Sequence, residues 1–108
     1  MLESSLEVTV TPAVTFTFEI VNGGDSPVTL TFRDGCRADF IVWDGDQEVW
    51  RYSNNRAFSQ AISTANLNPG ELATFTESWP DPIPGAYTAE AVLRVMETEL
   101  TDRTAFEI

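Results

Sequence analysis

The sequence predicts an all-β fold of antiparallel sheets, and three observations lead to this prediction. Apolar and polar residues alternate with a period of two along several segments, which places every second side chain on one face of a strand. Turn-forming residues separate these segments about every ten residues. The periodicity of an amphipathic helix is nearly absent from the chain. Together these features indicate two sheets packed face to face.

The N-terminal part of the chain contains two strongly alternating segments. Apolar residues occupy the even positions of residues 13–22, and the same phase continues over 28–33 after a Gly-, Asp- and Pro-containing turn at 22–27. We therefore expect these two segments to pair as antiparallel strands. A further strand precedes them, with Leu6, Val8 and Val10 on one face.

The middle of the chain predicts a hairpin over residues 37–52. Residues 40–43 are apolar at consecutive positions, as expected of a central strand covered on both faces or of one that pairs with a packed loop. Asp44-Gly45-Asp46 is a strong hairpin turn signal. After an irregular stretch at 53–58, we expect a strand through Gln60 and Ile62.

The C-terminal part predicts three more strands. A turn at 68–70 precedes a weakly alternating strand at 71–79, and the three prolines of 80–85 require a loop because they remove backbone donors. Residues 87–95 alternate cleanly, and a short last strand at 105–108 is expected to turn Phe106 and Ile108 inward. We expect about eight strands in an immunoglobulin-like antiparallel β-sandwich, as a single domain over residues 1–108. An open barrel is the main alternative.

The charge balance excludes several partners. The 108 residues include 17 Asp and Glu against 6 Arg, with no Lys, and the net charge is −11. Nucleic acid and anionic membranes are therefore poor partners, since both attract Lys and Arg. Without an apolar stretch long enough for a membrane helix or a signal peptide, the chain is expected to be soluble and cytoplasmic. The acidic, Lys-free composition indicates a halophilic origin, because at molar salt the Debye length falls to about 3 Å and surface carboxylates no longer repel one another strongly.

Enzymatic chemistry is disfavoured by the residue types present. With no His and one Cys, the chain has neither a Ser-His-Asp nor a Cys-His arrangement, nor the usual ligands of zinc. We predict a protein that is not an enzyme and takes no cofactor. Asp44, Asp46 and Glu48 are spaced to converge on calcium, but a solvated acidic turn is the favoured interpretation.

Cysteine and tryptophan each allow one further interpretation. Cys36 has only Arg37 beside it to lower its pKa, which favours a structural cysteine over a reactive thiol. Trp43, Trp50 and Trp79 could form a platform for stacking sugars, but core packing is the more usual use of such residues in a sandwich.

Several elements of the chain, in order, resemble the BsuPI family of intracellular proteinase inhibitors. The similarity runs from about residue 14 to residue 95. It is most specific in Asp39-Phe40, in the Trp-Arg-x-Ser element that starts at Trp50 and in the Phe-x-Gln element that starts at Phe58. The matching elements are residues 27–32, 35–40, 48–53, 58–61, 67–71 and 84–88. The departures from the family are the acid load and the missing Lys, which bear on the partner more than on the fold.

The resemblance implies an immunoglobulin-like sandwich that binds and blocks an intracellular subtilisin-type serine protease. Such an inhibitor needs only a loop or edge that fits an extended cleft. Residues 51–61 and 80–85 meet this requirement, and the second segment is stiffened by its prolines. The protease-binding candidates are Arg51, Ser53, Arg56, Phe58, Gln60, Pro82, Ile83 and Pro84. A non-inhibitory interaction module that binds through an exposed strand edge is the alternative function.

Overall fold

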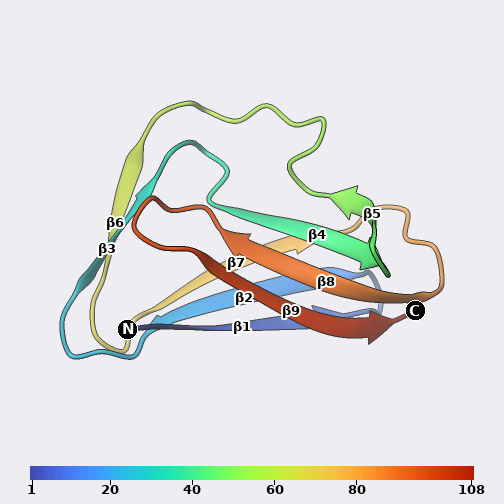
Figure 1. Cartoon of the computed structure of the whole chain (residues 1–108), viewed down its shortest axis with the longest axis horizontal. Helices are drawn as coiled ribbons and strands as arrows, with labels where there is room; N and C mark the ends of the chain where they lie inside the picture. The colour runs from blue at the N-terminus through green and yellow to red at the C-terminus, as the bar shows by residue number, and fades with distance from the viewer.

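The computed structural model describes residues 1–108 as nine strands in antiparallel ladders (Figure 1). The all-β prediction is confirmed, with one strand more than the eight expected. The structure has no helix long and apolar enough to cross a membrane. The strands are β1 Leu2–Thr9, β2 Thr15–Asn22, β3 Val28–Phe32, β4 Ala38–Asp44, β5 Gln47–Arg51, β6 Ser63–Leu67, β7 Leu72–Ser78, β8 Ala86–Leu93 and β9 Leu100–Glu107.

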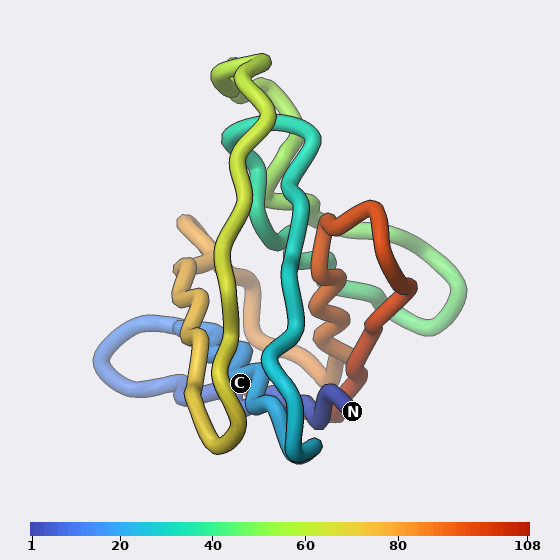
Figure 2. The backbone as a smooth tube through the Cα atoms, turned by 90° about the vertical axis from the view of Figure 1, so that its left-hand side faces the viewer, coloured from blue at the N-terminus to red at the C-terminus, as the bar shows by residue number.

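Two larger sheets enclose the core, and a two-stranded ribbon crosses one end of them. One sheet has the order β1-β2-β7, the other β5-β4-β8-β9, and β3 pairs only with β6. Figures 1 and 2 show the β3–β6 ribbon running across the direction of the other strands. Phe16 of β2 joins the layers, because its ring lies 5.9 Å from Phe40 of β4 and 6.0 Å from Phe106 of β9. The arrangement is a β-sandwich.

The expected pairing of residues 13–22 with 28–33 is wrong. β2 pairs with β1 and β7, while β3 pairs with β6. The fully buried Asn22 explains the divergence, because its side chain organises the connection between β2 and β3. Its Nδ2 donates to the carbonyls of Ser26 and Leu67, and its Oδ1 accepts from the N–H of Gly24. The chain is thereby directed out of the first sheet and into the ribbon.

Two further strand predictions are displaced. The strand expected through Gln60 and Ile62 begins only at Ser63, and Ile62 is 66% exposed. The last strand begins at Leu100 rather than at 105, and Ile108 lies beyond its end with an exposed side chain instead of pointing inward. In both places the short apolar pattern was too brief to mark where the ladder starts.

The predicted central hairpin is confirmed as β4 and β5. Its turn contains Gly45 at φ +60°, a conformation that glycine adopts without strain. β4 lies between β5 and β8, and its residues from Ala38 to Val42 are all buried. Ala38, Phe40 and Val42 belong to the core, so Asp39 and Ile41 point to the opposite face and are buried there.

The sandwich is closed along one side and open along the other. On the closed side β1 lies against β9, and Ser4 Oγ donates to Asp102 at 3.3 Å. On the open side β7 pairs with β2 through one edge only. At both ends of β7 the hydrogen bonds to the β2 side are made by odd-numbered residues. The Trp79 N–H donates to the Val14 carbonyl, and the Glu71 carbonyl accepts from the Asn22 N–H. The even-numbered residues of β7 therefore direct their backbone groups outward.

Candidate functional site

The connection between β5 and β6, residues 52–62, is the longest segment without a strand. We call it the 52–62 loop. Figure 2 shows it at the top of the molecule, where it projects beyond the sheets. Five of the predicted binding residues lie in it or at its base: Arg51, Ser53, Arg56, Phe58 and Gln60.

A buried carboxylate holds the base of the 52–62 loop. Asp39 is 1% exposed on the outer face of β4. It accepts hydrogen bonds from the Ser53 N–H at 3.1 Å and from Ser53 Oγ at 2.6 Å, and Arg51 Nη1 lies 3.4 Å from it. Arg51 also contacts Glu48 at 2.6 Å, and this hydrogen bond, followed by the charges of Glu48 and Asp39, raises the pKa of the guanidinium. Arg51 and Ser53 are thus tied to the protein body.

The role of Asp39 was missed by sequence reasoning, which treated it only as part of a motif. A signal for it exists, because a lone acid within an otherwise apolar central strand has to be paired when it is buried. Its partners Arg51 and Ser53 lie on the next strand and just after it, and the β4–β5 hairpin brings them within reach.

Two side chains of the loop fold back onto Tyr52. Arg56 Nε donates to the Tyr52 carbonyl at 2.7 Å, and its guanidinium carbon lies 4.4 Å from the centre of the Tyr52 ring. The Phe58 ring lies 6.0 Å from the same ring. Tyr52 itself packs against Phe40 of the core. Arg56 and Phe58 therefore act as a brace between the loop and the sandwich.

A third attachment lies near the end of the loop. The Gly35 N–H donates to the Ser59 carbonyl at 2.7 Å, and a Cβ added to Gly35 would lie 3.2 Å from the Ser59 nitrogen. A side chain here would press on the Ser59 backbone, which would have to shift by a few tenths of an ångström. Between the attachments, the backbone N–H and C=O groups of residues 55–58 make no hydrogen bond within the chain. The loop is thus held at both ends and has unpaired backbone groups in its middle.

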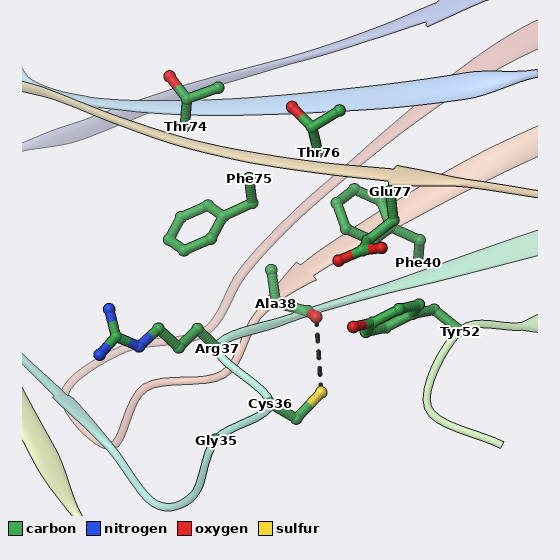
Figure 3. Close-up of a pocket in the computed structure, with 10 residues that line it drawn as sticks. All are labelled: Gly35, Cys36, Arg37, Ala38, Phe40, Tyr52, Thr74, Phe75, Thr76 and Glu77. Carbon is green, nitrogen blue, oxygen red and sulfur yellow. Dashed lines mark hydrogen bonds between the residues drawn. The ribbon is translucent and has the colours of Figure 1, made fainter. Parts of the chain in front are cut away.

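A cleft of about 290 Å³ lies between β7, the start of β4 and Tyr52 (Figure 3). Phe75 and Glu77 point into it, while Thr74 and Thr76 point away. Burial, followed by the charge of Glu77, raises the pKa of Tyr52. The cleft separates the base of the loop from the open edge of the sandwich.

Cys36 lines this cleft as a buried thiol. The residue is 3% exposed, and its Sγ donates to the Ala38 carbonyl at 3.5 Å. Burial, reinforced by the negative charge of Asp39, raises the thiol pKa to about 11. The thiol is protonated at neutral pH, so the structural interpretation fits this residue better than the reactive one.

The other three candidates, Pro82, Ile83 and Pro84, lie in the loop between β7 and β8. Ile83 is 69% exposed, but its carbonyl accepts a hydrogen bond from Tyr87 Oη at 2.6 Å. This loop borders a cleft of about 460 Å³ together with the β4–β5 turn. The turn and the 52–62 loop are at opposite ends of β5, so the structure places the eight candidates in two separate groups.

The tryptophans do not form an exposed platform. Trp79 is buried, with its ring 5.1 Å from Tyr87, and Trp50 stacks on Phe16 at 5.9 Å. Trp43 donates from Nε1 to Glu90 at 2.8 Å. The three rings therefore do not form the shared platform that the carbohydrate-binding alternative requires. The chain also has no group of three or more His, Cys, Asp or Glu residues that could hold a metal ion.

Comparison with known families identifies a match over most of the chain. The family model of BsuPI, described as intracellular proteinase inhibitor, matches residues 2–98. None of the curated proteins compared with the chain matches it. The matched region contains the first eight strands and both candidate loops, and β9 lies after it.

Proposed function

Because the chain belongs to the BsuPI family of intracellular proteinase inhibitors, we propose that it blocks a subtilisin-type serine protease through the 52–62 loop. Proteinase inhibition is the activity described for the family, and a proteinase is the partner that this activity implies. Inhibition by binding requires no catalytic group from the inhibitor. A chain without His and with its only thiol buried is suited to it.

The unpaired backbone of residues 55–58 is the observation that carries this proposal. Extended peptides bind to proteins largely through main-chain hydrogen bonds, while side-chain pockets supply specificity. A segment whose N–H and C=O groups are free is able to make such bonds with a protease cleft. The attachments through Ser53 and Ser59 fix the segment beforehand, which lowers the entropy lost on binding.

The predicted binding residues then divide by role. Arg51 and Ser53 support the base of the loop through Asp39. Arg56 and Phe58 brace the loop from Tyr52 and keep the segment in place. Gln60 is exposed beyond the brace and is free to contact the rim of the protease cleft.

The loop with Pro82, Ile83 and Pro84 is the second candidate for contact. Its prolines restrict the backbone, and Ile83 offers an exposed apolar side chain. However, the Ile83 carbonyl is already bound to Tyr87, whereas a substrate-like carbonyl has to be free for the oxyanion hole of the protease. We therefore propose that this loop makes secondary contacts.

The free edge of β7 favours one alternative function, binding of a non-protease partner by strand addition. Its outward backbone groups have no partner in the chain. A partner chain pairing with this edge would use main-chain bonds in the same manner as a substrate does.

The proposal is tested by titrating the protein against subtilisin in a buffer of high salt concentration. We expect residual activity to fall to zero near equimolar inhibitor. The double variant Arg56→Ala/Phe58→Ala should inhibit much more weakly than the wild type, whereas Ile83→Ala, which removes only a secondary contact, should weaken inhibition less. Full protease activity at a large excess of the protein would refute inhibition of this class of enzyme.

A further inference from the structure

The brace on Tyr52 determines which side chains of the loop face a partner. Arg56 and Phe58 are two residues apart and both contact the Tyr52 ring, Arg56 at 4.4 Å and Phe58 at 6.0 Å. Both side chains are thus held at the same ring, and one residue of the loop lies between them. That residue is Ala57, and it is exposed.

The neighbours of Ala57 leave it as the central side chain of the free segment. The backbone groups of residues 55–58 are unpaired, so a partner pairing with this stretch has Ala57 near its centre. Arg56 has its guanidinium on Tyr52 and its Nε on the Tyr52 carbonyl. A protease pocket could receive Arg56 or Phe58 only after the brace was broken. Ala57 needs no such rearrangement.

We propose that Ala57 determines the specificity of inhibition, as the side chain that enters the primary specificity pocket of the protease. This inference rests on the proposed function of the 52–62 loop. It assigns the chain to proteases whose pocket accepts a small uncharged side chain, and it excludes recognition through the charge of Arg56. The brace holds the chain on both sides of Ala57, so the segment stays in its binding conformation while it occupies the cleft.

The test compares substitutions at Ala57 with the same substitutions at Ala105, an exposed alanine of β9 that lies outside both candidate loops. Inhibition constants are measured against subtilisin, which has a large apolar pocket, and against trypsin, which requires a basic side chain. Changes of a methylene or more in such a pocket alter recognition by about 10- to 200-fold. We expect Ala57→Leu to shift the constant for subtilisin by this factor and Ala57→Arg to create inhibition of trypsin. Ala105→Leu and Ala105→Arg should leave both constants unchanged.

Two results would overturn the inference, and they differ in what else they refute. If the wild-type chain inhibits subtilisin but the Ala57 and Ala105 variants behave alike, the assignment of Ala57 is wrong and the proposed function stands. If the wild-type chain leaves subtilisin fully active, the proposed function fails and the inference fails with it. Unchanged melting temperatures of the four variants show that folding does not account for either result.

Discussion

The hydrogen bond between Ser53 Oγ and Asp39 gives a quantitative prediction for the base of the 52–62 loop. At 2.6 Å it is a short bond to a charged acceptor that is 1% exposed. A bond of this type contributes about 1.5 to 3 kcal/mol to the free energy of unfolding. We expect Ser53→Ala to lower that free energy by this amount. Asp39→Ala should lower it further, because the Ser53 N–H also loses its acceptor, while Arg51 keeps its contact with Glu48.

A double-mutant cycle isolates the pair. Urea denaturation of the wild type, both single variants and the double variant should give a coupling energy of about 1.5 to 3 kcal/mol. Ser53→Thr, which keeps the hydroxyl, serves as the control. The coupling should persist in molar salt because the pair is buried. By contrast, the exposed contact between Arg51 and Glu48 contributes at most about 1 kcal/mol and is screened. A coupling below about 0.5 kcal/mol, the usual limit of additivity, would refute the anchoring role of Asp39.

The same variants report on inhibition. Without the hydrogen bond between Ser53 Oγ and Asp39, the 52–62 loop loses the fixed conformation that distinguishes an inhibitor from a substrate. Ser53→Ala is expected to raise the inhibition constant and to be cleaved within the loop during incubation with subtilisin, as mass spectrometry of the fragments would show. Wild-type affinity together with resistance to cleavage would indicate that the loop is held by Tyr52 and Gly35 alone.

Three further predictions concern stability. Burial raises the pKa of Cys36 from 9.0 to about 11, so the folded state holds this proton more tightly than the unfolded state. The contribution of this difference to the free energy of unfolding is complete below pH 9 and is lost as the pH rises through 11. In urea titrations at alkaline pH, Cys36→Ala should therefore show a smaller fall of that free energy with pH than the wild type. Asn22→Ala should lower the free energy of unfolding by about 2 to 3 kcal/mol in chemical denaturation, since the buried Leu67 carbonyl, the Ser26 carbonyl and the Gly24 N–H lose their partner. The melting temperature should rise with added salt, because a net charge of −11 repels itself in dilute buffer; a flat response in calorimetry would contradict the halophilic interpretation.

The sequence predicted which face of each long strand is buried, but not which strands pair. In β2, Phe16, Phe18 and Ile20 are buried as their period-two spacing indicated, because alternation directly reflects a strand with one covered face. The same pattern carries no information about the neighbouring strand. The partner of β3 is β6, and the side chain of Asn22, which sets the course of the connection, has no signature in the alternation.

The two candidate segments were correctly predicted to be loops, but the roles proposed for their residues depend on contacts that only the fold supplies. A proline-rich stretch and a stretch without alternation both indicate loops from composition alone. Whether Arg56 and Phe58 point toward a partner or back to the body depends on Tyr52, whose ring is fixed by Phe40 of another strand. The importance of Ala57 follows from those neighbours and from no property of alanine itself.

The unpaired edge of β7 gives salt a second effect on this protein. Natural edge strands usually carry Lys, Pro or a bulge that prevents another copy from pairing with them. β7 has none of these, its register with β2 is continuous, and Leu72 is exposed on it. In dilute buffer the repulsion between copies of a strongly acidic chain keeps such edges apart. Molar salt reduces the range of this repulsion to about 3 Å, so the conditions that stabilise the fold also remove its main protection against edge-to-edge aggregation. We therefore expect the range of salt concentrations in which the protein stays folded and dispersed to have two limits. Aggregation sets the upper limit, and loss of stability sets the lower one.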